Sequence, residues 1–265
     1  MFIRFPQLAK RPYFIRPIMT PKPSQFYLER LKNKGIETDN RKLLVLDLNG
    51  TLLSRPIKDR SHTSVSSASS TAIPRPGVKN FLKYAFSNYS VMVYSSSRRD
   101  NVNAMLNCIM TSEQIKSLTA CWTRENMGLS TAHFNSKVQT FKNLDAIWEN
   151  LKTDGNGKAA NWSQYNTVII DDSEVKCAAH PFNHIHVSDF SHSTVDYRKD
   201  FMLVCAVRYL KHLKDIPNVS NYIFQHPFRL NYNLSQDENL KCLDQAIENY
   251  KQDSGTVKQA EGQID

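Results

Sequence analysis

Two acidic motifs in this chain directly follow short aliphatic runs. Asp47 comes after residues 43–46, and Asp171 and Asp172 come after residues 168–170. A run that is apolar at every position is typical of a strand buried on both faces of a parallel sheet. Carboxylates are rarely buried without a partner. We therefore predict that these carboxylates lie at the carboxyl ends of buried strands, where open α/β sheets bind ligands.

The residue types at these predicted strand ends suit phosphoryl transfer. Asp47 and Asp171 offer hard oxygen ligands of the kind that Mg²⁺ prefers. A free oxygen of Asp47 could attack phosphorus and form an aspartyl-phosphate. Ser95 follows a predicted strand over residues 90–94, and Lys142 opens a predicted helix. Both side chains could hold phosphate oxygens and offset their charge.

Four motifs, in this chain order, resemble those of the haloacid-dehalogenase superfamily of phosphatases: Asp47-Leu48-Asn49-Gly50-Thr51, Ser95, Lys142 and Asp171-Asp172. A closer resemblance is to the branch of the RNA polymerase II carboxy-terminal-domain phosphatases and nuclear-envelope phosphatases. That branch carries Arg-Pro-Gly before its first helix, as at residues 75–77. The resemblance covers roughly residues 42–215. It implies an α/β fold with a Rossmann-like parallel sheet flanked by helices, and with small cap insertions.

The resemblance also implies a role for each matching residue. The catalytic residues would be Asp47, Asn49, Thr51, Ser95 and Lys142. Ser96 and Arg75 would contact the substrate. The Mg²⁺ site would comprise Asp47, the backbone carbonyl of Asn49, Asp171 and Asp172. Asp172 would support the site from beside the ion rather than coordinate it directly. Two neighbours stay open as alternatives, because Ser96 competes with Ser95 and Lys137 competes with Lys142.

Asn49 departs from the family pattern, which has an aspartate two residues after the nucleophile. The amide keeps the backbone carbonyl for Mg²⁺ but cannot exchange a proton, and acid–base assistance is typically worth ~10²- to 10⁴-fold in rate. The sequence thus predicts a phosphatase for phosphoserine or phosphothreonine proteins with weakened acid–base catalysis. The alternative is a phosphatase-fold binding module, for example a mitochondrial protein-import component. The retained Asp47, Lys142 and Asp171 favour the enzyme.

The charge is uneven along the chain. Residues 1–42 hold ten Lys/Arg and three Asp/Glu, whereas the remainder holds 24 and 22. The nearly neutral remainder argues against nucleic acid as a partner. No apolar run approaches the ~20 residues of a membrane-spanning helix. Five scattered cysteines without a Cys-x-x-Cys motif indicate a reducing compartment. We expect a mitochondrial, cytoplasmic or nuclear protein that is not secreted, with a phosphoprotein substrate or protein partner.

Three regions are expected: a basic extension over residues 1–41 that resembles a targeting segment, a phosphatase-like domain over 42–215, and a C-terminal extension over 216–265 that ends in a polar tail. Within the domain, residues 61–71 are Ser-rich and predict a loop. Residues 111–136 are expected to be irregular, residues 152–165 a surface loop, and residues 197–214 a helix. His184 and His186 are expected at the surface rather than on a metal.

Overall fold

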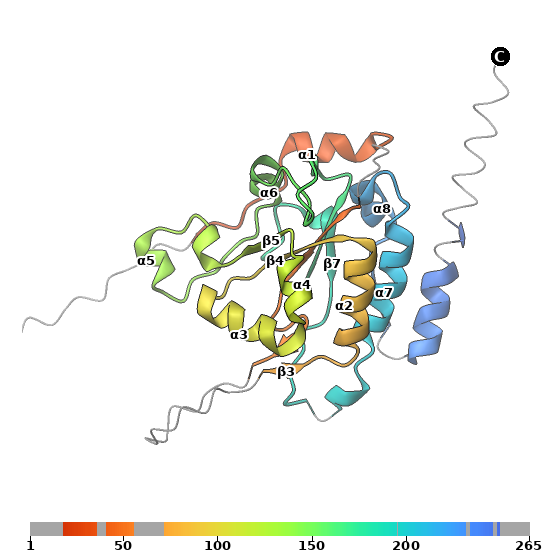
Figure 1. Ribbon diagram of the computed structural model, residues 1–265. Helices are drawn as coiled ribbons and strands as arrows, with labels where there is room; N and C mark the ends of the chain where they lie inside the picture. The colour runs from red at the N-terminus through yellow and green to blue at the C-terminus, as the bar shows by residue number, and fades with distance from the viewer. Residues whose placement is uncertain are drawn as a thin grey trace, which may run out of the picture.

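The computed structural model describes residues 18–35, 41–55, 72–194, 196–231, 234–245 and 248–249. Their centre is a five-stranded parallel sheet in the order β5-β4-β1-β6-β7 (Figure 1). The strands are β1 (Leu43–Leu46), β4 (Ser90–Tyr94), β5 (Ala120–Trp122), β6 (Thr167–Asp171) and β7 (His184–His186), and β2 (Leu53–Ser54) pairs with β3 (Ile73–Pro74) in a separate antiparallel ribbon. The predicted α/β fold with a parallel sheet is confirmed.

Helices cover both faces of the sheet because the central strand is apolar in both directions. Leu44 and Leu46 of β1 belong to one buried cluster, and Leu43 and Val45 belong to another. The first cluster is completed by α2 (Val78–Asn88), α3 (Arg99–Ile109), α7 (Met202–Leu213) and α8 (Val219–Gln225), and the second by α6 (Leu144–Asn150). Successive strand residues point to opposite faces, so one aliphatic run supplies two cores.

The strand order reverses between β1 and β6. From β1 the chain moves outward to β4 and β5, then returns to the other side of β1 to form β6 and β7. The carboxyl ends of two strands that flank such a switch point leave a crevice, which is where open α/β sheets bind ligands. Asp47 directly follows β1, and Asp171 is the last residue of β6. The topology therefore places both carboxylates beside this crevice.

Two segments are more ordered than their sequences predict. Residues 111–136 were expected to be irregular, but they contain α4 (Ser112–Lys116), the edge strand β5, a 3-10 turn η2 (Arg124–Asn126) and α5 (Thr131–Phe134). β5 has only three half-buried residues, too few for a detectable period. The expected surface loop at 152–165 carries Trp162 and Tyr165 into the interior.

The predicted helix over 197–214 begins at Met202, after a 3-10 turn η4 (Tyr197–Lys199). The predicted Ser-rich loop lies outside the described residues.

The part of the N-terminal extension that the structure describes packs onto the domain. Helix α1 (Gln25–Glu29) continues into a 3-10 turn η1 (Arg30–Lys32), which contacts α8. Tyr27 is buried, and its hydroxyl donates to Asn183 Oδ1 at 2.9 Å and accepts from the Phe182 backbone N–H at 3.1 Å. A domain boundary at residue 41 would separate these residues from their partners. Residues 1–17 and 36–40 of the predicted basic extension lie outside the described residues.

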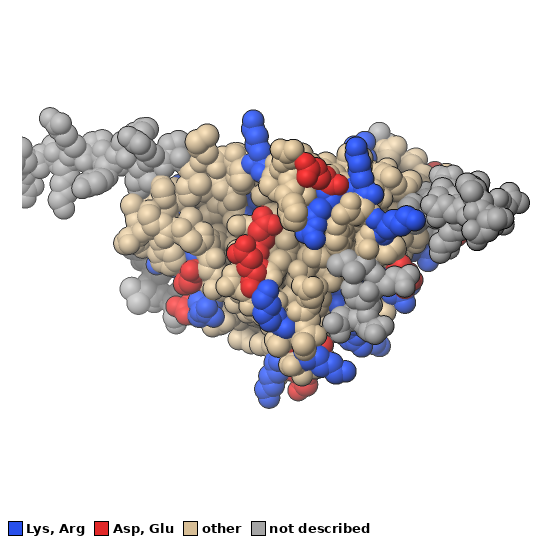
Figure 2. All heavy atoms as spheres, turned by 90° about the horizontal axis from the view of Figure 1, so that it is seen from above, with Lys and Arg blue, Asp and Glu red and all other residues tan. Residues whose placement is uncertain are grey.

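Charged side chains of both signs share the face that carries α1. Figure 2 shows Lys and Arg interspersed with Asp and Glu there, without one continuous basic area. Within the described residues, no helix has both the length and the apolar character needed to cross a membrane.

Candidate active site

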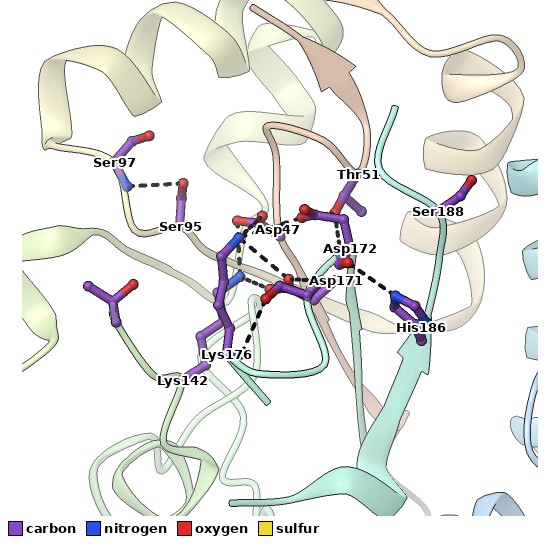
Figure 3. A network of polar contacts seen from close by, with 12 residues as sticks. Asp47, Thr51, Ser95, Ser97, Lys142, Asp171, Asp172, Lys176, His186 and Ser188 are labelled. Atoms are coloured by element: carbon purple, nitrogen blue, oxygen red, sulfur yellow. Dashed lines mark hydrogen bonds and ion pairs between the residues drawn. The ribbon is translucent and has the colours of Figure 1, made fainter. Parts of the chain in front are cut away.

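Three carboxylates meet at the switch point of the sheet. One oxygen each from Asp47, Asp171 and Asp172 lies within 4.8 Å of the others (Figure 3). Asp47 and Asp171 are buried, and the Asp47 backbone N–H donates to the Ile170 carbonyl at 3.0 Å, which continues the β1–β6 pairing to the site. Neighbouring oxygen ligands of one Mg²⁺ lie about 3–4 Å apart when each is about 2.1 Å from the ion. The donor set fits a small, hard divalent cation.

Lys142 lies between the two buried carboxylates. Its ammonium is 3.0 Å from Asp47 Oδ1 and forms a short ion pair with Asp171 Oδ2, and its side chain is fully buried. Burial lowers the pKa of Lys142, but Asp171 and Asp47 outweigh burial, so the pKa lies above its ordinary value. For Asp171, burial alone would raise the pKa. The ion pairs with Lys142 and Lys176 outweigh burial, so the pKa of Asp171 lies below its usual range. Lys142 therefore stays a cation and Asp171 an anion.

Thr51 and Gly50 hold Asp172 against the first motif. The Asp172 backbone N–H donates to Thr51 Oγ1 at 3.1 Å, and this hydroxyl lies 3.3 Å from Asp172 Oδ1. A Cβ on Gly50, which has φ +84°, would lie 2.6 Å from Asp189 Oδ1 and 2.9 Å from Asp172 Cγ. Only glycine allows this approach. Burial raises the pKa of Asp172 to about 6, against the opposing effect of Lys176.

The predicted serine follows the next strand of the sheet. Ser95 is buried directly after β4, and its Oγ accepts the Ser97 backbone N–H at 3.3 Å. The hydroxyl proton of Ser95 therefore remains available to a ligand. Ser96 is half-buried beside it.

The side chain of Asn49, two residues after Asp47, is exposed. Its Oδ1 accepts the Arg55 backbone N–H at 3.1 Å. This contact directs the amide nitrogen of Asn49 away from Arg55, and the nitrogen can only donate.

Arg75 is buried and paired within the protein, whereas the sequence predicted a contact with the substrate. Its guanidinium is buried and makes a bidentate pair with Asp200, at 3.0 Å and 2.8 Å. Its remaining N–H groups donate to the carbonyls of Thr51 and Ser188 and to Ser188 Oγ, at 3.0–3.1 Å. All five N–H groups of the guanidinium are thus used within the protein. Through its hydrogen bond to the Thr51 carbonyl, Arg75 stabilises the loop that follows Asp47.

The structure adds a residue that the sequence prediction missed. The ammonium of Lys176 is 3.4 Å from Asp47 Oδ2, 3.6 Å from Asp171 Oδ1 and 3.5 Å from Asp172 Oδ1. Its pKa is raised because these carboxylates outweigh burial. The one signal in the sequence was the spacing of four residues between Asp172 and Lys176, which is the spacing of a local ion pair.

His184 is buried, whereas the sequence predicted a surface position. Its Nε2 lies 2.9 Å from the Asp171 carbonyl oxygen, and burial lowers its pKa to about 4. A neutral ring that donates to this carbonyl supports the backbone of Asp171. The exposed His186 agrees with the prediction. β7 is a three-residue edge strand, so its alternation could not show which histidine faces inward.

Comparison with known proteins agrees with the motifs. The family model of NLI interacting factor-like phosphatases matches residues 42–221. A Schizosaccharomyces pombe protein, named as an uncharacterized FCP1 homology domain-containing protein, is 56% identical over 238 residues, which cover 89% of this chain and 97% of the relative.

Two more distant similarities involve proteins named as carboxy-terminal-domain (CTD) phosphatases. The Xenopus laevis ubiquitin-like domain-containing CTD phosphatase 1 is 24% identical over 205 residues, which cover 74% of this chain and 59% of that protein. The solved structure of Fcp1, an essential RNA polymerase II CTD phosphatase, overlaps with a TM-score of 0.41 at 14% identity, covering 91% of this chain and 70% of the other. The family assignment rests on the sequence matches. This chain belongs to the NLI interacting factor-like phosphatase family, in the CTD phosphatase branch of the haloacid-dehalogenase superfamily.

Proposed function

We propose that this protein is a Mg²⁺-dependent phosphatase that transfers the phosphoryl group of phosphoserine or phosphothreonine in proteins to Asp47. The observation that carries the proposal is the convergence of Asp47, Asp171 and Asp172 on one point, with Lys142 beside them. Family membership supports a phosphoric monoester hydrolase. A relative named as a CTD phosphatase supports a phosphoprotein as the class of substrate.

Asp47 acts as the nucleophile in the proposed reaction, and Lys142 and Ser95 bind the phosphate. An oxygen of Asp47 attacks phosphorus, the ester bond breaks, and its electrons leave with the alcohol oxygen. Lys142 and Ser95 hold the non-bridging phosphate oxygens, because one supplies a fixed charge and the other a free hydroxyl proton. Water then cleaves the aspartyl-phosphate, which releases inorganic phosphate and restores Asp47.

The carboxylates would hold the metal together with the Asn49 carbonyl. When bound, Mg²⁺ would offset the charge of the phosphate oxygens and orient them toward Asp47. Asp171 and Asp172 have no role as nucleophiles in this scheme. Their function is to keep the cation and the phosphate beside Asp47.

Removal of the metal tests the proposal. We expect hydrolysis of an activated aryl phosphate to stop after treatment with EDTA and to return when Mg²⁺ is added in excess. The measurement is the release of phenolate from the full chain, with an equal addition of Ca²⁺ as the control for ionic strength. Turnover that persists without a divalent cation would contradict the metal requirement. A well-folded protein with no turnover would favour the alternative, a binding module.

The amide at position 49 should make hydrolysis slower for alkyl phosphates, the class that includes phosphoserine and phosphothreonine, than for aryl phosphates. Because Asn49 cannot protonate the departing oxygen, an alkoxide must leave without help, whereas a phenolate leaves readily. Asn49→Asp restores a proton carrier at the rim of the site. We expect it to raise kcat/KM for alkyl phosphates about 10²-fold and to change the value for aryl phosphates much less.

A second variant separates proton transfer from added charge. Asn101 is exposed, and its Oδ1 accepts from Arg55 Nη2 at 3.2 Å, so Asn101→Asp adds the same charge nearby. We expect no selective gain for alkyl phosphates in this control. Equal gains in the two variants, or no gain in Asn49→Asp, would refute the assigned role of Asn49.

A further inference from the structure

We infer that Lys176 is a tethered cation that competes with the divalent metal for the same carboxylate oxygens and so weakens metal binding. This inference rests on the proposed function, because it concerns the metal that the function requires. Among the described residues, Asp47, Asp171 and Asp172 form the one acidic group close enough to share an ion. The Lys176 ammonium contacts all three of them.

The two lysines of the site take different oxygens of the same carboxylates. Lys142 contacts Asp47 Oδ1 and Asp171 Oδ2. Lys176 lies nearest to the opposite oxygens, Asp47 Oδ2 and Asp171 Oδ1, and to Asp172 Oδ1. With Lys142 fixed in the interior, the oxygens left for a metal are those that Lys176 faces. An ammonium and a divalent cation cannot both occupy that position, because like charges repel strongly at contact distance.

The contacts of Lys176 are those of a displaceable group. Its three distances are nearly equal and all exceed the 2.7–2.9 Å of a strong charge-assisted hydrogen bond. Its side chain is 18% exposed, whereas that of Lys142 is 0% exposed. Figure 3 shows Lys176 reaching the carboxylates from its own loop, next to Lys142. The side chain can therefore withdraw toward solvent while that of Lys142 stays in place.

The backbone keeps Lys176 close even when its side chain withdraws. The Lys176 carbonyl accepts the Lys142 backbone N–H at 2.7 Å, and the Lys176 backbone N–H lies 3.4 Å from Ser173 Oγ. The tether gives the ammonium a high effective concentration at the site. Binding of the metal must therefore displace a cation that is always present.

Metal binding in the absence of substrate tests this inference. We expect Lys176→Gln, which removes the charge, to bind Mg²⁺ about tenfold more tightly than wild type in a calorimetric titration of the full chain. Tenfold corresponds to ~1.4 kcal/mol, about what loss of a few partly exposed ion pairs supplies. Lys176→Arg keeps the charge and should bind Mg²⁺ less tightly than the Gln variant. The matched control is Lys116→Gln, at an exposed position on α4, which should bind as wild type does.

Thermal unfolding supplies a readout that does not depend on calorimetry. Without metal, Lys176→Gln leaves three carboxylates with one ammonium, so its Tm should fall below that of wild type. Saturating Mg²⁺ should raise the Tm of this variant more than that of wild type. Unchanged or weaker Mg²⁺ binding by Lys176→Gln would overturn the inference. If that result came with normal Mg²⁺-dependent turnover in wild type, the proposed function would stand and only the role of Lys176 would fall.

Discussion

Asp47→Asn should reduce Mg²⁺-dependent turnover of an aryl phosphate by at least about 10³-fold. The substitution keeps the size of the side chain but removes the oxygen nucleophile, and no other described carboxylate lies at the end of β1. The remaining groups would still bind phosphate, because Lys142 and Ser95 are unchanged. We therefore expect kcat to carry most of the loss, with KM changed much less.

The control for this prediction is another aspartate near the same loop. Asp189 is exposed beside Gly50 and stands outside the carboxylate group. Asp189→Asn should keep activity within a few-fold of wild type. Melting curves of both variants would verify folding, since Asp47→Asn removes one partner of the buried Lys142. Residual turnover in Asp47→Asn equal to that in Asp189→Asn would show that Asp47 is not the nucleophile.

Arg75→Met should lower the free energy of unfolding by about 3–5 kcal/mol, the typical cost of breaking a buried ion pair. The variant would leave Asp200 without its bidentate partner, and the carbonyls of buried Thr51 and half-buried Ser188 without this donor. Unpaired polar groups in the interior lose their hydrogen bonds with water and gain none in return. Urea unfolding followed by circular dichroism measures this loss.

The chain offers a matched pair at its surface. Arg208 and Asp244 also interact through two contacts, but their side chains are 43% and 40% exposed. Arg208→Met should cost less than about 1 kcal/mol, as exposed ion pairs do. Losses of equal size in the two variants would mean that burial does not set the contribution of Arg75.

The elements that carry the site could be predicted because their sequences have a simple pattern. β1, β4 and β6 are largely apolar runs, and a polar residue directly follows β1 and β4 and is the last residue of β6. Their carboxyl ends bring Asp47, Ser95 and Asp171 to one edge of the sheet. The apolar runs therefore predicted the parallel sheet, and the carboxylates predicted at the ends of β1 and β6 do lie close together.

The features that the sequence did not predict depend on contacts between distant segments. Arg75 pairs with Asp200, 125 positions away, and such a partner leaves no local pattern. Tyr27 binds Asn183, 156 positions away, so no local pattern indicated that this part of the N-terminal extension packs onto the domain. Lys176 lies in a turn without periodicity, where a lysine is ordinarily solvated. In each case the deciding quantity is burial, which spacing alone does not give.

Identification of the phosphorylated residue would show whether Asp47 is the nucleophile. Wild-type protein with Mg²⁺ and an activated aryl phosphate would be quenched in acid during turnover, and its peptides analysed by mass spectrometry. We expect one phosphoryl group on the side chain of Asp47, which hydroxylamine should release as it does from other acyl phosphates. A stable phosphate on Ser95, or steady turnover with no covalent phosphate on the protein, would contradict it.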